Sequence, residues 1–322
     1  MVDEKPQEDV LDCLVAGGGP AGLTAALYAS RSGMTTLVLE GKTTVSQITV
    51  TDIIENYPGV PQAGGFEFHD RIRTQALGFG ARASAEDVQS LKKTTLENGL
   101  EAWEVVTGDN SYRALSVIIA SGARWRSLGV PGEEKFLGRG VSYCATCDGP
   151  FYRGRSVAVV GGGDTAIQEA LFLTKFADKV TVIHRRERLR AAAILQERAF
   201  ANPKIDFYWN GVIEGIEGDD FVKGVKVRNL GENGEITTLP LDGVFIFIGL
   251  DPQTEFVKGV VNLDDGGYII TDSSMRTSQR GIFAAGDCIA KSLRQVVTAC
   301  GDGATAAHEA SLHVDDLKGR SY

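Results

Sequence analysis

Two cysteines followed directly by a carboxylate are the residues of this chain best suited to chemistry. Cys144 and Cys147 are two residues apart in the segment 143–150, and Asp148 comes next. Thiols at this spacing can close a small disulfide ring and open it again, and the C-x-x-C arrangement often lowers a thiol pKa. A neighbouring carboxyl group would be a useful proton donor or acceptor for such a reaction. The pattern favours a redox-active pair, with half of a zinc site or an inert bridge as the alternatives.

The other cysteines bear on these alternatives. A four-ligand zinc site needs a second pair of ligands, whereas Cys13, Cys288 and Cys300 occur singly. Five cysteines in 322 residues are also too few and too dispersed for a secreted disulfide scaffold. We therefore expect no metal site, a catalytic role for the C-x-x-C pair, and a cytoplasmic protein.

A nucleotide-binding pattern opens the chain. An apolar run over 10–16 leads into Gly17-Gly18-Gly19-Pro20-Ala21-Gly22 and then a helical run over 23–31. This G-x-G-x-x-G turn between strand and helix is typical of dinucleotide binding, because its glycines let the backbone approach a pyrophosphate at the helix N-terminus. The next strand, 36–39, ends at Glu40, an acid well placed for a ribose diol.

The same pattern recurs after the cysteines. A strand over 156–160 leads into Gly161-Gly162-Gly163-Asp164-Thr165-Ala166, and the following strand ends at His184-Arg185-Arg186, with Arg190 close behind. His184 stands at the same offset from its turn as Glu40 does, so the two units are in register. Arginines here favour a 2′-phosphate, because a guanidinium stays charged and binds phosphate bidentately. We expect FAD or NAD at the first turn and NADP(H) at the second, with a solvated basic helix start or a nucleic-acid patch as the alternatives.

Composition and periodicity complete the pattern of a two-domain α/β protein. The 43% hydrophobic content and 39 glycines suit an α/β fold rich in tight turns. The net charge of -9 argues against nucleic acid or an anionic membrane as a partner, and no apolar run approaches the length of a membrane span. Further strands are expected over 82–91, 100–107, 112–119, 205–207, 221–228, 236–239, 244–248 and 282–287, and further helices over 66–79, 166–176 and 293–313. Gly231–Gly234 predicts a hairpin turn in an antiparallel flap.

These motifs together resemble those of the low-molecular-weight thioredoxin reductases, which are pyridine nucleotide–disulfide flavoenzymes. The resemblance covers nearly the whole chain. Its carriers are the two glycine turns, the segment 55–59 (ENYPG), the segment 144–148 (CATCD), the arginine motif 184–190, Gly286-Asp287 and Arg294-Gln295. In the glutathione reductase type the redox cysteines lie in the FAD unit, whereas here they directly precede the second glycine turn.

The resemblance implies an α/β fold of two Rossmann-like FAD/NAD(P)-binding domains, the second inserted in the first. The FAD domain would comprise residues 1–123 and 252–322, and the NADPH domain with the disulfide would comprise 124–251. The implied FAD contacts are Gly17, Gly19, Pro20, Ala21, Gly22, Glu40, Gln47, Asn56, Gly286, Asp287, Arg294 and Gln295. The implied NADPH contacts are Gly161, Gly163, Asp164, Thr165, Ala166, His184, Arg185, Arg186 and Arg190.

The resemblance also implies a mechanism. Cys147 would face the flavin, Cys144 would attack the disulfide of thioredoxin, and Asp148 would serve as acid–base. The NADPH domain would rotate between half-reactions on hinges near Gly122 and 249–251. A homodimer is expected from the family alone.

The chain departs from the family at two places. Val45-Ser46 replaces the common Gly-Gly before Gln47, which changes how closely that loop can approach the cofactor. Ser121 stands where threonine is usual.

Three other functions compete with this one. A relative fed by ferredoxin or another reduced carrier, and a dithiol oxidase that passes electrons to oxygen, would typically lack the arginine motif. A flavin-binding scaffold would need no paired thiols.

Overall fold

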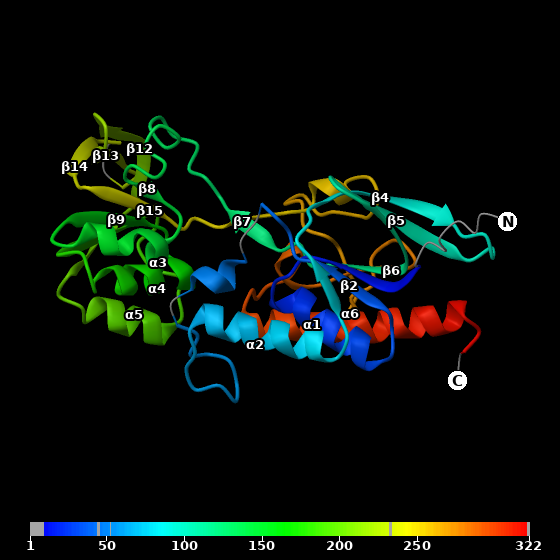
Figure 1. Cartoon of the computed structure of the whole chain (residues 1–322). Coiled ribbons are helices and arrows are strands. Elements are labelled where there is room, and N and C mark those ends of the chain that lie inside the picture. Colours follow the sequence, from blue (N-terminus) through cyan, green and yellow to red (C-terminus); the bar gives the residue numbers. More distant parts are fainter. Residues whose placement is uncertain (1–9, 44–45, 52, 232–233, 321–322) are drawn as a thin grey trace. The chain divides into compact units, whose positions relative to one another are not determined.

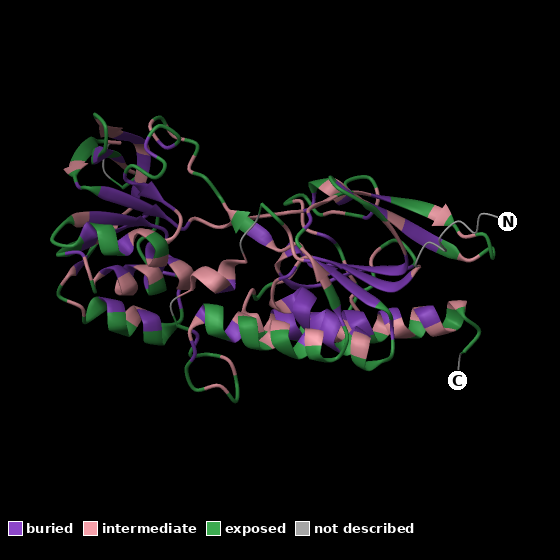
Figure 2. Cartoon of the chain, viewed as in Figure 1, coloured by how far each residue is buried: buried purple, intermediate pink, exposed green. Residues whose placement is uncertain are grey.

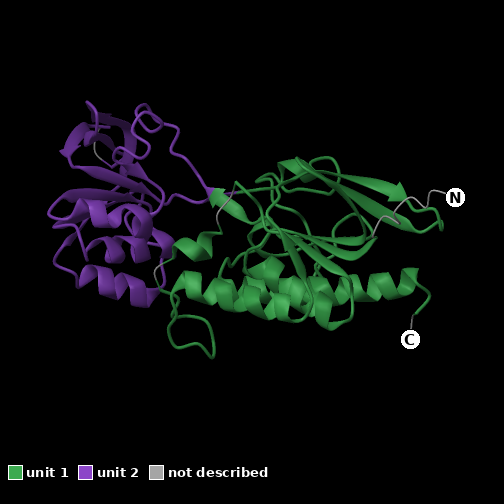
Figure 3. Ribbon diagram, in the orientation of Figure 1, with its two compact units in different colours: residues 1–124, 252–322 green, residues 125–251 purple. Residues whose placement is uncertain are grey.

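The computed structural model describes residues 10–43, 46–51, 53–231 and 234–320. The chain forms two compact units, one comprising residues 1–124 and 252–322 and the other residues 125–251 (Figures 1 and 3). The middle of the chain is therefore a unit of its own, inserted between the two segments of the first. Within the described residues, no helix is both long enough and apolar enough to cross a lipid bilayer.

The sheet of the first unit joins a parallel half to an antiparallel hairpin. Its strands are β1 (Leu11–Ala16), β2 (Thr36–Leu39), β3 (Arg82–Ser84), β4 (Val88–Thr95), β5 (Glu101–Thr107), β6 (Ser111–Ile119) and β17 (Ile282–Ala284). The order is β3-β2-β1-β6-β5-β4, with β17 pairing with β6. Pairs among β1, β2, β3, β6 and β17 are parallel, and those made by β4 and β5 are antiparallel. The parallel strands β1 and β2 are buried throughout, as their continuous apolar runs predict.

Three helices lie along one side of this sheet: α1 (Pro20–Arg31), α2 (Gly65–Gly78) and α6 (Val296–Leu317) (Figure 1). Small apolar residues of α1 and α6 share one buried cluster with the sheet, and much of α1 and of the central strands is drawn as buried in Figure 2. A Cβ at Gly303 of α6 would lie 2.1 Å from the carbonyl oxygen of Ala21. Glycine at this position therefore lets the backbones of α1 and α6 touch.

The prediction of a single strand over 82–91 is wrong, because β3 and β4 are separate strands with a break at 85–87. The break turns Glu86 inward, where only 7% of the residue is exposed. Its carboxylate accepts hydrogen bonds of 2.6–3.1 Å from the hydroxyls of Ser84, Thr107 and Tyr112 and the amide of Asn110. These bonds, with that from Ser84 first in its effect on the pKa, lower the pKa of Glu86 to about 2, because they favour the charged form.

Replacing Glu86 by glutamine should destabilise the protein at neutral pH but not at low pH. Since the pKa of Glu86 falls from 4.5 to about 2 on folding, its charge stabilises the fold above pH 4.5, and this stabilisation is lost as the pH falls toward 2. We expect E86Q to lower the free energy of unfolding by about 3 kcal/mol at pH 7. Urea unfolding at the two pH values measures the difference, with E97Q on the exposed loop as the control. An equal loss at pH 7 and near pH 2 would show that the charge of Glu86 has no part in it.

The second unit is built on a parallel sheet. Its strands are β8 (Val141–Ser142), β9 (Ser156–Val160), β10 (Lys179–His184), β11 (Ile205–Trp209) and β15 (Gly243–Ile246). The order is β11-β10-β9-β15-β8, and every pair is parallel. Helices α4 (Asp164–Leu173) and α5 (Ala193–Phe200) pack on it through a buried apolar cluster. Both units thus place a glycine turn between their central strand and a helix, and the predicted fold class of two Rossmann-like domains is confirmed.

An antiparallel flap covers part of the second unit. It consists of β12 (Gly211–Gly218), β13 (Val222–Asn229) and β14 (Ile236–Pro240), paired in that order. The last two strands match the predicted hairpin, although residues 232 and 233 of its turn lie outside the described residues. The sequence prediction missed β12, whose three glycines mask the apolar positions Val212, Ile213 and Ile216.

The chain crosses between the units in two short strands, β7 (Ala123–Trp125) and β16 (Leu250–Pro252), which pair with each other. On the first-unit side, the Gln253 backbone N–H donates to the Gly122 carbonyl oxygen at 3.0 Å. On the second-unit side, the Arg126 guanidinium lies 2.7 Å from the Asp251 carboxylate. Each end of the crossing is therefore fixed within its own unit.

Candidate active site

The glycine turn after β1 is a backbone cradle that side chains would fill. Gly17 has a φ of +124°, and a Cβ there would lie 2.2 Å from the carbonyl oxygen of Ala120. A Cβ at Gly22 would lie 1.9 Å from the carbonyl oxygen of Gly17. The N-cap residue of α1, Gly19, gives the helix no side-chain cap. The first N–H groups of α1 are therefore available to an anion.

The turn after β9 repeats this geometry. Gly161 has a φ of +145°, and a Cβ there would lie 2.3 Å from the carbonyl oxygen of Phe247. A Cβ at Gly18 would lie 2.7 Å from Cβ of Glu40, and one at Gly162 would lie 2.5 Å from the His184 ring. Glu40 and His184 therefore occupy equivalent places beside their turns, as their matched offsets in the sequence predict.

The segment after β10 folds back onto the second turn. The backbone N–H groups of Arg190 and Ala191 donate to the Gly162 carbonyl oxygen at 2.7 and 3.2 Å. The Asp164 carboxylate accepts the N–H of Ala192 at 2.7 Å. These bonds hold the arginine motif next to the N-terminus of α4. Three arginines of the motif have exposed side chains: Arg185, Arg186 and Arg190. Within the described residues, their guanidinium groups make no hydrogen bond or ion pair.

His184 carries a buried polar atom without a partner. The residue is 6% exposed, and its Nε2 has no hydrogen-bond partner among the described residues. Burial lowers the pKa of His184, and the positive charges of the three arginines lower it further. Buried polar atoms nearly always have a partner in the working state of a protein. The unpartnered Nε2 and the exposed arginines beside it together suit an anionic ligand that accepts hydrogen bonds.

The two cysteines of the C-x-x-C motif form a disulfide at the start of a short helix. Cys144 is the N-cap of α3 (Ala145–Asp148), and its Cα lies 5.3 Å from that of Cys147. The Cys147 backbone N–H donates to Cys144 Sγ at 3.1 Å. A backbone donor at this sulfur favours its thiolate once the disulfide is open. Asp148, half-buried, ends the helix directly after Cys147.

The residues before Cys144 fix its position, and sequence reasoning missed them. The buried Ser142 hydroxyl accepts the Cys144 N–H at 3.0 Å and donates to the Cys144 carbonyl oxygen at 3.2 Å. The Tyr143 hydroxyl donates to the Glu133 carboxylate, which also accepts the N–H groups of Leu128 and Gly129 at 2.8 and 2.6 Å. Burial and the Glu133 charge raise the pKa of Tyr143. A buried acid ten residues from its partner leaves no periodic signal in the sequence.

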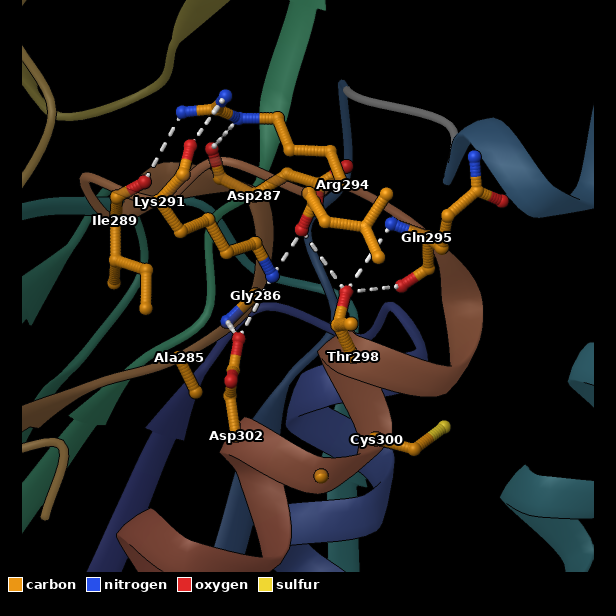
Figure 4. Close-up of polar contacts among 12 residues, drawn as sticks. Ala285, Gly286, Asp287, Ile289, Lys291, Arg294, Gln295, Thr298, Cys300 and Asp302 are labelled. Carbon is orange, nitrogen blue, oxygen red and sulfur yellow. Dashed lines mark hydrogen bonds and ion pairs between the residues drawn. The ribbon is translucent and has the colours of Figure 1, made fainter. Parts of the chain in front are cut away.

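The second segment of the first unit brings its motif to the same cradle. Gly286 begins a short 3-10 turn, η4 (Gly286–Cys288), and a Cβ at Gly286 would lie 2.7 Å from Cβ of Ala21. The Gly286 N–H donates to Asp302 of α6 at 3.2 Å, and Asp302 also accepts from Lys291 at 2.7 Å (Figure 4). The Gly-Asp motif is thus tied to both α1 and α6.

Asp287 carries another buried oxygen atom that accepts no hydrogen bond within the part of the chain that the structure describes. Its Oδ1 has no hydrogen-bond partner among the described residues, and Lys291 Nζ lies 3.7 Å away. Burial raises the pKa of Asp287, although the charges of Lys291 and Arg294 oppose this. Arg294 closes the turn, because its guanidinium donates to the carbonyl oxygens of Asp287, Ile289 and Lys291 (Figure 4).

The N-terminus of α6 completes the arrangement. Gln295 is its N-cap and forms a capping box with Thr298. The Asn56 amide donates to Gln295 Oε1 at 3.0 Å, so two predicted FAD residues far apart in the sequence are in contact. Gln47 donates instead to the Ala123 carbonyl oxygen at 2.5 Å. Val45 lies outside the described residues, and Ser46 Oγ lies 3.4 Å from where a Cβ at Gly19 would be.

Comparison with known proteins agrees with this geometry. The family model described as pyridine nucleotide-disulphide oxidoreductase matches residues 11–303. A thioredoxin reductase of Peptoclostridium acidaminophilum is 48% identical over 315 residues, which cover 96% of this chain and 98% of the relative. The chain belongs to the pyridine nucleotide–disulphide oxidoreductases, in the branch of the low-molecular-weight thioredoxin reductases.

Solved structures of this family share the fold. A crystal structure of Lactococcus lactis thioredoxin reductase in the FR conformation has a TM-score of 0.91 and 44% identity, covering 95% of this chain and 99% of that one. A crystal structure of T. acidophilum thioredoxin reductase has a TM-score of 0.88 and 35% identity, covering 96% of this chain and 100% of that one. The chain is accordingly a thioredoxin-disulfide reductase by family, with FAD and NADPH as its cofactors.

The residues present fit both cofactors. The first cradle has free helix N–H groups for a pyrophosphate, an acid beside its middle glycine, and the buried Oδ1 of Asp287 for a hydroxyl chain. The second has exposed guanidinium groups and the buried Nε2 of His184. Within the described residues, no three His, Cys, Asp or Glu side chains are grouped so as to hold a metal ion.

Proposed function

We propose that this protein reduces the disulfide of thioredoxin with electrons from NADPH, through FAD and the Cys144–Cys147 pair. The observation that carries the proposal is the disulfide itself, which is placed in the same unit as an arginine-flanked nucleotide cradle. FAD, when bound, supplies the two-electron link between NADPH and the disulfide.

The two cofactors are assigned to the units by the chemistry of the two cradles. We assign FAD to residues 1–123 and 252–322, because Glu40 suits an unphosphorylated ribose. We assign NADPH to residues 124–251, because three guanidinium groups suit a 2′-phosphate. In the first unit Asp287 would accept hydroxyl groups of the ribityl chain, and Gln295 would lie at the helix N-terminus that favours the charge of a reduced flavin.

The thiol chemistry follows from the geometry of α3. With the disulfide reduced, the Cys144 thiolate attacks one sulfur of thioredoxin's disulfide, that bond breaks, and the departing sulfur takes up a proton. Cys147, deprotonated, then attacks Cys144 Sγ in the mixed disulfide. This step restores the Cys144–Cys147 bond and releases thioredoxin as a dithiol. We assign the exchange of protons with these thiols to Asp148, which directly follows Cys147.

One flavin must serve two partners in this scheme, so we propose that the second unit rotates between half-reactions. Both the disulfide and the arginine motif belong to that unit. The crossing strands β7 and β16 are short, and Gly122 and Gly249 next to them have φ values of +68° and +136°. Short crossings flanked by such glycines suit a hinge.

An anaerobic titration with NADPH tests the proposed function. We expect the flavin absorbance of the purified protein to bleach at near-stoichiometric NADPH and to recover when oxidised thioredoxin is added. A flavin that dithionite reduces and NADPH does not would show a ferredoxin-type donor or a dithiol oxidase instead. Bleaching by NADPH without recovery on adding thioredoxin would show that another disulfide is the substrate.

A further inference from the structure

Helix α2 contacts the adenosine end of the proposed FAD site through two side chains one turn apart. The Arg73 guanidinium donates two hydrogen bonds to the Glu40 carboxylate, from Nε to Oε1 at 2.6 Å and from Nη2 to Oε2 at 3.1 Å. His69 Nε2 lies 2.8 Å from the Gly18 carbonyl oxygen, to which it must donate because a carbonyl oxygen only accepts. The same helix face therefore holds both the acid and the middle glycine of the first cradle.

The bidentate contact leaves Glu40 suited to a diol. A carboxylate has roughly four acceptor positions. Arg73 uses one on each oxygen, which leaves acceptor capacity on both oxygens for the two neighbouring hydroxyls of a ribose. The fork also fixes the plane of the carboxylate, which a single-point contact would not do. The Glu40 side chain is 20% exposed, so the contact lies at the edge of the fold rather than free in solvent.

Charge gives a second reason for Arg73. A dinucleotide would bring two negative phosphate groups to the N-terminus of α1, beside the turn that packs against Glu40. The guanidinium offsets this repulsion without taking the hydroxyls' place. We propose that Arg73 is a positioning residue of the FAD site, which holds Glu40 in the orientation that accepts both hydroxyls of the adenosine ribose. The inference rests on the ribose-binding role proposed above for Glu40.

The helix contains its own control. Arg71 also pairs with a glutamate, Glu67, at 2.5 Å, but both side chains are largely exposed, at 64% and 58%. An exposed pair of this kind contributes little to stability. R71M therefore removes an arginine–glutamate pair from α2 without touching the cradle, whereas R73M removes the pair that holds Glu40.

The test measures affinity for two flavins. Apoprotein of the wild type, R73M and R71M is titrated with FAD and with an FAD analogue that carries 2′-deoxyadenosine, and flavin fluorescence gives each Kd. The wild type should prefer FAD about tenfold or more, because one hydrogen bond to a charged acceptor is lost with the analogue. R73M should bind FAD about tenfold more weakly and prefer it only about twofold. R71M should match the wild type with both flavins.

Two results would overturn the inference. If R73M raises the Kd for both flavins by the same factor, Arg73 supports the fold and does not position Glu40. If the wild type itself does not distinguish the two flavins, Glu40 does not bind the ribose and the inference fails with that assignment. Neither result alters the response of the flavin to NADPH and thioredoxin, which tests the proposed function separately. R73K, which keeps the charge without the fork, should show an intermediate preference and reports on Arg73 if R73M does not fold.

Discussion

Replacing Cys144 by serine should abolish thioredoxin reduction while NADPH still reduces the flavin. The nucleophile of the exchange is lost, so we expect turnover with thioredoxin to fall by at least about a thousandfold. Stopped-flow absorbance of the flavin after mixing with NADPH should stay within about twofold of the wild-type rate, because that step does not use the thiols. Cys147→Ser should stop turnover equally, since the mixed disulfide can then not be resolved.

The two serine variants should differ in how fast they form a mixed disulfide with thioredoxin. The Cys147 N–H points at Cys144 Sγ, which favours Cys144 as the attacking thiolate. C147S should therefore form a mixed disulfide rapidly with thioredoxin whose single active-site cysteine carries an activating thionitrobenzoate, and C144S should form it slowly. The reverse order would assign the attack to Cys147. Cys13→Ala is the matched control, because complete burial raises the pKa of Cys13 to about 12 and keeps it from forming a thiolate.

The sequence predicts the cradles well because their steric demands are local. Spacing within one β-α-β unit fixes all three of them. The first glycine has a positive φ, the third position must stay small, and the residue at the strand end packs against the middle glycine. The residues at the strand ends, Glu40 and His184, are therefore found where the matched offsets place them. The sequence also predicts the parallel strands, because burial on both faces of the sheet requires a continuous apolar run.

The contacts that support the site cannot be predicted from the sequence, because their partners come from different elements. Arg73 belongs to a helix that approaches Glu40 only in the folded unit, and Lys291 meets Asp302 across a turn and a helix. A charged residue on an amphipathic helix gives the same pattern whether it faces solvent, as Arg71 does, or a cofactor site. The missed break at 85–87 has a similar cause, since the hydroxyls that draw Glu86 inward come from other strands.

Replacing Arg185 and Arg186 together by alanine should lower kcat/KM for NADPH far more than kcat/KM for NADH. Each guanidinium is exposed and has no partner in the described part of the chain, so it is available for charge-assisted hydrogen bonds to a 2′-phosphate. Two such contacts should lower kcat/KM for NADPH by about a hundredfold or more. NADH lacks the phosphate, so its kcat/KM should change by less than about threefold.

The ratio of the two losses separates a phosphate contact from damage to the fold. Arg188 is exposed in the same segment and is not among the residues assigned to the phosphate. R188A should therefore leave kcat/KM unchanged with both NADPH and NADH. Salt provides a further check, because contacts between exposed charges weaken as ionic strength rises. The KM for NADPH of the wild type should rise with salt, and that of the double variant should rise much less. Equal losses with NADPH and NADH would instead mean that the two arginines support the strand end at His184, and the preference for a phosphorylated cofactor would have to come from elsewhere.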